Sequence, residues 1–512
     1  MCGLLYTNIN FEKEDFLRAL KLMHHRGPDA SGHYFHNQHK FGHNRLKILD
    51  LNDISNQPFF SQDRRYLIIY NGEIFNFREL AKEHKLNLQT SSDTEVLLEL
   101  YIKFGEGMLQ MLNGMFAFII YDSQNDELFI ARDRLGIKPL YLYEKGNEII
   151  ISSEINAIVY LNNEVQLDDI GKRQYLKLRT FFNNRTIYKD IKFFPAGHYM
   201  KSGKIKKYWE YPEGSQEPPS IDELNELVTN AVNRWKIADV PVGSFLSGGL
   251  DSTIVTALSN TQHSWTSGFH SMNEFEWGKL ASTHIKTEHH ELLVDKDQFR
   301  DTLDHMIKVR REPLSVPNEV MLFLMSKQAS EYNTVIMAGE GADEIFFGYD
   351  RIFRWAYSAK EWNLEQFTKL YAYGAEDDYE IIDEIITPFQ QKFKKPIDIV
   401  SAFFQTDHLH GLLRRLDNST MLASIEARVP FVDHTLIERL AGVPFDWKME
   451  NGIVKSPLKK AFSSYIPKEI IDRKKVGFPV PLELIDFNID KSRSNNYDDW
   501  LNYNLDQLSL NN

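Results

Sequence analysis

The chain has 512 residues, 42% of them hydrophobic and 26% charged, which indicates a globular protein with two or more domains. Its net charge of −13 disfavours a phosphate-tracking surface, so nucleic acid is not an expected partner. The apolar runs are shorter than a membrane span, and no basic segment followed by an apolar run opens the sequence, which predicts a cytoplasmic protein without membrane association.

Cys2 is the only cysteine of the chain. A single thiol excludes an internal disulfide and a cysteine-rich zinc site. Any chemistry of Cys2 must therefore proceed without a second cysteine.

The first predicted elements are two helices. From residue 11 an apolar face that includes Phe16 and Leu20 predicts an amphipathic helix, which must end before Gly27-Pro28. A second helix is expected to begin near Ser92, which has capping-box spacing to Glu95, and to stop at Gly105.

Strand-forming segments surround these helices. They are rich in β-branched and aromatic residues and are separated by turn signals such as Asn125-Asp126. The segments are 65–76, 115–122, 127–133, 138–146 and 148–154, with a last hairpin within 193–212. Residues 1–211 are therefore expected to form sheets covered by helices, and the Pro-, Gly- and Ser-containing segment 212–220 is expected to be a linker.

The pattern changes after this linker. Short apolar runs at 240–246, 263–269 and 334–339 each lead into a turn, and helical stretches separate them. This alternation predicts an α/β domain over 221–512 with a parallel sheet, whose catalytic loops lie at the carboxyl ends of the strands.

A glycine-rich loop follows the first of these runs. The string "SGGLDS" holds Ser247, Gly248, Gly249, Asp251 and Ser252 at the predicted junction of a strand and a helix. Adjacent glycines let the backbone approach an anion, hydroxyls and helix N–H groups can bind it, and an aspartate can hold Mg²⁺. The alternative is an ordinary glycine turn. No lysine follows the glycines as in a Walker A loop, but the full string resembles the pyrophosphate-binding loop of the ATP-pyrophosphatase superfamily.

A second group of acids follows the run at 334–337. Glu340, Asp343 and Glu344 lie within five residues. They could be a solvated helix start stabilised by the helix dipole. Beside the glycine loop, the favoured interpretation is that Asp343 binds Mg²⁺ and that Glu340 handles a proton or a substrate amine.

Together with the start "CGLL" and the segment 472–481, these motifs resemble the glutamine-hydrolysing asparagine synthetase family over nearly the whole chain. The resemblance implies an α+β N-terminal-nucleophile hydrolase domain at 1–211, with sheets sandwiched by helices. It implies an α/β parallel-sheet ATP-pyrophosphatase domain at 221–512. It further implies a carbon-nitrogen ligase that uses glutamine, ATP and Mg²⁺ to amidate a carboxylate through an acyl-adenylate, with ammonia passing through an apolar tunnel. A homodimer is a family-level expectation.

The position of Cys2 suits catalysis once Met1 is removed. An N-terminal cysteine carries an α-amine with a pKa near neutrality, which can accept the thiol proton. The resemblance implies that Cys2 attacks the glutamine side-chain amide and that Asn71 and the Gly72 N–H stabilise the oxyanion. The ordinary interpretation of Asn-Gly is a hairpin turn, and both roles are compatible. A chance placement of the lone cysteine is the alternative.

Further site residues are implied by the same resemblance. The glutamine site would comprise Arg45, Leu46, Lys47, Ile48, Leu49, Asn71, Gly72, Glu73 and Asp93. Asp93 has a competing role as an acid in the first turn of a helix. The ATP site would comprise Leu246, Ser247, Gly248, Gly249, Asp251, Ser252, Ser267, Ala338 and Gly339, with Asp251 and Asp343 on the metal. Ser267 stands where an aliphatic residue is usual.

Basic residues near the ATP site come from the C-terminal part of the chain. Lys455 matches a catalytic lysine, although lysines are usually solvated surface residues. Arg428, Arg473, Lys474 and Lys475 are expected near the same pocket.

The acceptor is the least determined part of the interpretation. Arg311, Val316 and Asn318-Glu319 depart from the family pattern near the expected acceptor pocket, and Phe347 replaces a common glycine. Aspartate, converted to asparagine, is the favoured acceptor. One alternative is another carboxylate, such as a sugar uronate in surface polysaccharide biosynthesis. An alternative of another class is a catalytically silent regulatory or scaffolding homologue, which is disfavoured by the presence together of Cys2, Asn71, Asp251, Glu340 and Lys455.

Overall fold

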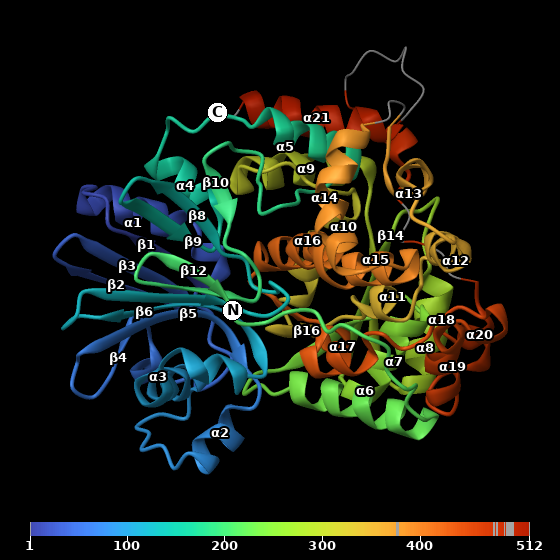
Figure 1. Ribbon diagram of the computed structural model, residues 1–512, viewed down its shortest axis with the longest axis horizontal. Helices are drawn as coiled ribbons and strands as arrows, with labels where there is room; N and C mark the ends of the chain where they lie inside the picture. Colours follow the sequence, from blue (N-terminus) through green and yellow to red (C-terminus); the bar gives the residue numbers. More distant parts are fainter. Residues whose placement is uncertain are drawn as a thin grey trace.

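A computed structural model describes residues 2–374, 378–474, 477, 480–485, 487 and 496–510 of the chain. Its amino-terminal part is a stack of two antiparallel sheets and its carboxyl-terminal part is built mainly from helices around a smaller sheet (Figure 1). Within the described ranges, each helix falls short of the length and apolarity that crossing a bilayer requires.

The amino-terminal part contains two six-stranded sheets within the described residues, ordered β10-β8-β9-β1-β3-β2 and β12-β11-β7-β6-β5-β4. The strands of the first sheet are β1 (Cys2–Thr7), β2 (Ala30–His36), β3 (His39–Arg45), β8 (Tyr141–Lys145), β9 (Glu148–Ser152) and β10 (Ile191–Phe193). Those of the second are β4 (Phe59–Phe60), β5 (Tyr66–Ile74), β6 (Gly114–Asp122), β7 (Glu127–Arg132), β11 (His198–Lys201) and β12 (Lys204–Lys207). The helices of this part are α1 (Lys13–Leu22), α2 (Phe77–Glu83), α3 (Asp93–Phe104), α4 (Ile155–Leu161) and α5 (Asp169–Leu178).

Alternation along the strands explains how these layers stack. Leu4 of β1 and Ile69 of β5 belong to one buried cluster between the sheets, whereas Leu5 packs with α1 and α4, and Ile68 packs with α3. Each fully buried aliphatic or aromatic side chain contributes roughly 1.5–3 kcal/mol. The result is the predicted α+β domain, with two sheets sandwiched by helices.

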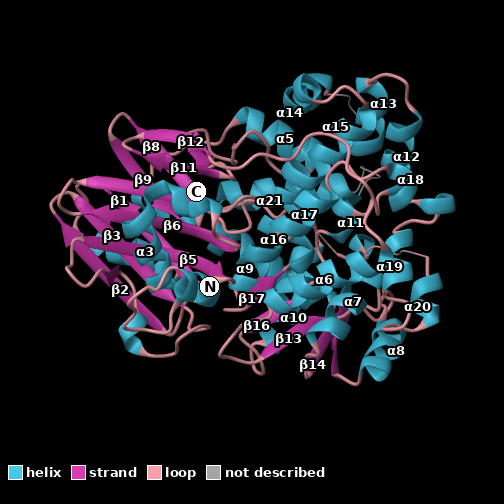
Figure 2. Ribbon diagram, turned by 60° about the horizontal axis from the view of Figure 1, so that its bottom comes forward, coloured by secondary structure: helices cyan, strands magenta, loops and turns pink. Residues whose placement is uncertain are grey.

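The carboxyl-terminal sheet is parallel, with the order β15-β14-β13-β16-β17 among the described residues. Its strands are β13 (Val242–Phe245), β14 (His263–Gly268), β15 (Glu288–Leu293), β16 (Val335–Met337) and β17 (Glu426–Arg428). Figure 2 shows these strands beneath a large group of helices. The chain runs from β13 outward to β14 and β15 and then returns to the other side of β13 as β16, so the strand order reverses between β13 and β16. Ligands of open α/β sheets bind at such a reversal.

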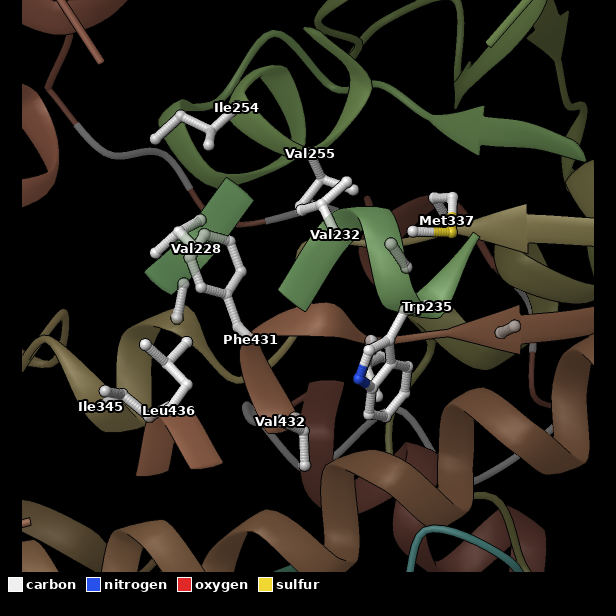
Figure 3. Packing of buried hydrophobic residues seen from close by; sticks show 14 of the residues in the cluster. Val228, Val232, Trp235, Ile254, Val255, Met337, Ile345, Phe431, Val432 and Leu436 are labelled. Carbon is white, nitrogen blue, oxygen red and sulfur yellow. The ribbon is translucent and has the colours of Figure 1, made fainter. Parts of the chain in front are cut away.

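The helices of this part are numerous. They are α6 (Ile221–Trp235), α7 (Leu250–Ser259), α8 (Phe275–Ile285), α9 (Lys296–Arg310), α10 (Asn318–Ala329), α11 (Ala342–Ile345), α12 (Asp350–Ser358), α13 (Leu364–Tyr371), α14 (Tyr379–Lys392), α15 (Pro396–Phe403), α16 (Leu409–Met421), α17 (His434–Leu440), α18 (Phe445–Lys448), α19 (Ser456–Ala461), α20 (Lys468–Asp472) and α21 (Asn496–Leu510). Val232 and Trp235 of α6 share a core with Val255 of α7 and Met337 of β16 (Figure 3). No helix or strand occupies the described segment 208–220, which precedes α6.

Candidate active sites

The first candidate site lies where β1 and β5 face each other. Side-chain alternation places Cys2 on the same face of β1 as Leu4, and Asn71 on the same face of β5 as Ile69. The backbone N–H of Cys2 donates a hydrogen bond to Asn71 Oδ1 at 2.9 Å. The thiol is 7% exposed and accepts a hydrogen bond from the Leu46 N–H, while burial raises its pKa.

Asn71 and Gly72 lie inside β5, opposite Ala117 and Phe116 of β6, so the strand expected within 65–76 is confirmed and a hairpin turn at Asn-Gly is not formed. Glycine is required for close packing instead. Gly72 has φ +155°, and a Cβ there would lie 2.1 Å from the Met115 carbonyl oxygen. Within the described part of the chain, the buried Asn71 Nδ2 has no hydrogen-bond partner. An unsatisfied buried donor beside a thiol suits an oxyanion.

Two buried carboxyl groups continue this site. Asp93 Oδ2 accepts hydrogen bonds from the Tyr70 hydroxyl and the Ile74 N–H, both at 2.9 Å. Burial raises the pKa of Asp93 to about 6 and, together with the charge of Asp93, raises that of Glu73 well above its ordinary value. Ser92, not Asp93, is the N-cap of α3. A bound ammonium group would stabilise the ionised form of two carboxyl groups whose pKa values are raised in this way.

Arg45 lies directly opposite Cys2 in the sheet. Its terminal nitrogens donate to the carbonyls of Leu49, Asp50 and Asn52 and to the Asn56 side chain. None of these acceptors is a carboxylate. The buried guanidinium therefore holds the loop at 49–56, and these contacts do not neutralise its charge. Backbone groups of two other residues in the predicted glutamine-binding run 45–49 already form hydrogen bonds within the protein. The Lys47 N–H donates to Asp29, and the Ile48 carbonyl accepts from the Asp239 N–H.

The second candidate site begins after β13. Gly248 has φ +70°, and a Cβ there would meet the Trp277 carbonyl. Ser247 Oγ lies 3.1 Å from Ser252 Oγ and accepts a hydrogen bond from the Gly249 N–H. This loop therefore presents hydroxyls, backbone N–H groups and the start of the ten-residue helix α7 at one place, as an anion site requires.

Two aspartates and a lysine meet at this loop. Lys455 Nζ lies 2.5 Å from Asp251 Oδ2 and 2.6 Å from Asp343 Oδ1, although 204 residues separate Lys455 from Asp251. Burial would lower the pKa of Lys455, but the two carboxylates outweigh it and raise the pKa. Two carboxylates that converge on one cation are an oxygen donor set that fits Mg²⁺.

Glu340 follows the neighbouring strand β16 at the same edge of the sheet. The Ala338 N–H donates to the Arg428 carbonyl, and a Cβ at Gly339 would lie 2.8 Å from the Ser252 nitrogen. The end of β16 therefore packs against the glycine loop. Burial raises the pKa of Glu340, which favours its proton-accepting and proton-releasing roles near neutral pH.

The remaining predicted ATP contacts lie along β13 and β14. Leu246 is fully buried, and its N–H donates to the Trp265 carbonyl. Ser267, in β14, is buried, and its hydroxyl lacks a hydrogen-bond partner among the described groups. The replacement of an aliphatic residue by serine thus leaves a buried polar atom on this strand.

Of the four basic residues expected near the loop, only Arg473 is seen to contact it in the portion that the structure describes. Arg473 donates to the Gly248 carbonyl at 3.1 Å, forms an ion pair with Glu274 and covers the Trp277 ring. Lys474 is exposed, and Lys475 lies outside the described residues. Arg428 instead directs its side chain away from the loop, to Glu426 at 2.6 Å.

One residue near Cys2 has a larger role than the sequence indicated. Arg26 donates to the Cys2 carbonyl at 3.1 Å and is fully buried. It also pairs with Glu154 of the same domain and with Asp417 of α16. Its segment "HHRGPDASG" (24–32) gives no indication of these pairs, because the partner on α16 is 391 residues away.

Comparisons with known proteins find a matching family model for each half of the chain. The family model described as asparagine synthase matches residues 223–508, and that described as glutamine amidotransferase domain matches residues 1–209. The chain is 30% identical to asparagine synthetase [glutamine-hydrolyzing] 3 of Bacillus subtilis, over 94% of this chain and 87% of that protein. It is 29% identical to asparagine synthetase [glutamine-hydrolyzing] 1 of the same organism, over 92% and 84%. It is 30% identical to asparagine synthetase B of Escherichia coli, over 90% and 78%.

Proposed function

Because the chain belongs to the asparagine synthase family and carries a glutamine amidotransferase domain, we propose that it amidates L-aspartate to L-asparagine, with glutamine as the nitrogen donor and ATP as the energy source. AMP, pyrophosphate and glutamate are the other products. The observation that carries the proposal is the convergence of Lys455, Asp251 and Asp343 on the glycine loop, in a chain that also buries Cys2 against Asn71.

Glutamine hydrolysis takes place in the first site. With Met1 removed, the Cys2 nitrogen becomes the α-amine and accepts the thiol proton, while the sulfur attacks the glutamine amide carbon. The Asn71 Nδ2 donor and the Gly72 N–H stabilise the oxyanion. The thioester then forms with release of ammonia, and water hydrolyses it to glutamate. One oxyanion donor contributes roughly 10²–10³ in kcat.

Glutamine is held by its charged end. Glu73 and Asp93 receive the α-ammonium group, because an ammonium ion stabilises two buried carboxylates whose pKa values are raised without it. The positive charge of Arg45 attracts the α-carboxylate, with the backbone of residues 46–49 beside it.

ATP binds at the second site. The loop at 246–252 receives the phosphates, and Ser267, Ala338 and Gly339 line the nucleotide. Asp251 and Asp343 would hold Mg²⁺, which supplies charge neutralisation to the phosphates when bound. With ATP present, Lys455 turns from the two aspartates to the pyrophosphate as it leaves. A carboxylate oxygen of the acceptor attacks the α-phosphorus to give the acyl-adenylate. Glu340 takes a proton as ammonia displaces AMP.

The departures at 311–319 have structural causes that leave aspartate as the preferred acceptor. Glu319 is fully buried, pairs with Arg310 at 2.6 Å and accepts a hydrogen bond from the Ser315 N–H at 2.6 Å. Arg311 is the C-cap of α9 at φ +59°, and its carbonyl accepts a hydrogen bond from the Tyr188 hydroxyl. The Glu319 side chain is thus used within its own loop and does not require a more anionic acceptor, and we retain aspartate as the proposed acceptor.

Pyrophosphate release from purified protein with ATP, Mg²⁺ and glutamine tests the proposal. We expect release to depend on aspartate and to equal asparagine formation. Glutaminase activity without aspartate-dependent pyrophosphate would contradict aspartate as the acceptor while leaving the amidotransferase intact.

A further inference from the structure

Two histidines and a glutamate gather at the beginning of β14 and β15, outside both candidate sites. In the parallel pairing of these strands, His263 lies beside Glu288, and Trp265 lies beside His290. Residues two apart on a strand share a face, and neighbours across a parallel pair point to the same side. His263, Glu288 and His290 therefore project from one face of the sheet, next to its edge.

The potential ligand atoms of these three residues are already close together. His263 Nδ1 lies 3.1 Å from His290 Nε2, and the Glu288 carboxylate oxygens lie 3.6 Å from the first nitrogen and 4.0 Å from the second. Zinc bonds of about 2.0–2.2 Å in tetrahedral geometry separate ligand atoms by roughly 3.3 Å. The two imidazole nitrogens have nearly this spacing, and the carboxylate needs only a small movement.

Packing holds the imidazoles in place. The His290 ring stacks on Trp265 with a centroid distance of 5.0 Å and an interplanar angle of 13°, and the Tyr332 ring lies 5.0 Å from both imidazoles. The His263 and His290 side chains are 14% and 17% exposed, whereas Glu288 is 61% exposed. Two ligands are thus oriented in advance, and the third can close over the ion from the solvent side.

This group is separate from the nucleotide site in place and in chemistry. The phosphate loop follows the carboxyl end of β13, while His263 and Glu288 are the first residues of the parallel strands β14 and β15. Phosphate-bound Mg²⁺ prefers oxygen ligands, whereas two imidazoles and a carboxylate suit zinc.

We propose that His263, Glu288 and His290 bind one Zn²⁺ ion, with water as the fourth ligand. The ion links edge strand β15 to β14, and so it stabilises the two ends of the connection that runs through α8. Trp277 of α8 packs its carbonyl against Gly248, which gives the ion a structural connection to the phosphate loop. Without metal, the two rings share an imidazole hydrogen bond.

Zinc binding is measured by titration calorimetry on the full chain after chelator treatment. Cys2→Ala is the background, because the thiol is a competing zinc ligand, and excess Mg²⁺ occupies the carboxylate site. We expect about one Zn²⁺ per chain, an increase in the melting temperature, and X-ray absorption that shows two nitrogen ligands at about 2.0–2.1 Å. His263→Ala and His290→Ala should abolish binding. His284→Ala, which removes an exposed imidazole from α8, is the matched control and should bind zinc normally.

Glu288→Gln keeps the test decisive if a histidine variant fails to fold, because its side chain is exposed and nearly the same shape. We expect it to weaken zinc binding by about tenfold or more, as loss of a charged ligand does. Absence of stoichiometric zinc in the parent, or full binding in the histidine or glutamine variants, would overturn the proposal.

Discussion

Arg428 Nη2 lies 3.7 Å from Glu73 Oε1, so a charge at the end of the carboxyl-terminal sheet reaches the proposed glutamine site of the amino-terminal part. Both side chains are buried, and Arg428 also pairs with Glu426 at 2.6 Å. Burial and Asp93 raise the pKa of Glu73, and Arg428 opposes them. The ionisation of Glu73, which we propose binds glutamine, therefore depends on a residue of the carboxyl-terminal part.

Replacement of Arg428 should weaken glutamine binding. Arg428→Met removes the charge that lowers the pKa of Glu73, so less of the ionised form is present at a given pH. We expect the KM for glutamine to rise by about tenfold at neutral pH, equivalent to roughly one pKa unit, and the acid limb of kcat/KM to move to higher pH. Arg428→Lys should restore much of the loss. An unchanged KM and pH profile in Arg428→Met would show that this contact is only structural.

Asn71→Ala should slow glutamine hydrolysis with little change in KM. The buried Nδ2 donor is unsatisfied without substrate and is needed only when negative charge develops on the oxygen. We expect kcat of the glutaminase to fall by about 10²–10³. Alkylation of Cys2 by iodoacetamide reports whether the thiol is still presented correctly. A kcat close to that of the parent would remove Asn71 from the oxyanion site.

Glu340→Gln should abolish synthesis and spare glutamine hydrolysis. The variant keeps the shape of the side chain at the end of β16 but cannot accept a proton, and general base catalysis contributes about 10²–10⁴ in rate. Asparagine formation and glutaminase activity are measured in the same preparation. Retained synthesis would make Glu340 a structural acid.

The sequence predicted local features better than distant contacts. Ser92 caps α3, Gly105 ends it at φ +56°, and the strand segments of the first half all appear. These features depend on residues that are close in the chain. Asn71-Gly72 left a turn open as well as a strand, because a turn and a close approach between strands both select glycine, and only the position of Met115 distinguishes them.

In the candidate sites too, local motifs were predicted from the sequence and contacts between distant residues were not. Cys2 and the glycine loop stand out in the sequence because their motifs are continuous. The convergence of Lys455 on Asp251, and of Arg26 on Asp417, depends on how strands and helices far apart in the chain pack together. The direction of a side chain also could not be predicted from the sequence. Arg428 lies in β17 beside β16, and its guanidinium turns toward Glu73 and not toward the ATP pocket, near which the sequence placed it.

Phe347 shows a departure whose compensation is visible only in the structure. It has φ +57°, a conformation that favours the glycine common at this position and is rare for a bulky residue. Its ring stacks on Phe353 at 4.2 Å, and Lys448 Nζ lies 4.4 Å from its centroid. Stacking between the two aromatic rings thus offsets part of the backbone strain.

Lys448→Met should stabilise the protein most at neutral and acid pH. Burial lowers the pKa of Lys448 from 10.5 to about 7. Well below pH 7 both states are protonated, and the folded state carries the full cost of a buried charge, on the order of 5 kcal/mol. Between the two pKa values the unfolded state binds more protons, so the parent gains stability as pH rises, and the advantage of methionine declines.

Urea unfolding of the parent and of Lys448→Met at pH 6.5 and at pH 9.5 measures this difference directly. Lys468→Met, at an exposed lysine of α20, is the control. A stability difference between parent and Lys448→Met that does not change with pH would contradict a depressed pKa of Lys448.

The most direct test of a two-site synthetase is asparagine formation by Cys2→Ala with ammonium in one assay and glutamine in the other. In the proposed mechanism the thiol is needed only to release ammonia, and the acyl-adenylate forms in the other domain. We predict that synthesis with ammonium remains close to that of the parent while synthesis with glutamine is lost. Equal loss of both activities, or continued synthesis with glutamine, would contradict it.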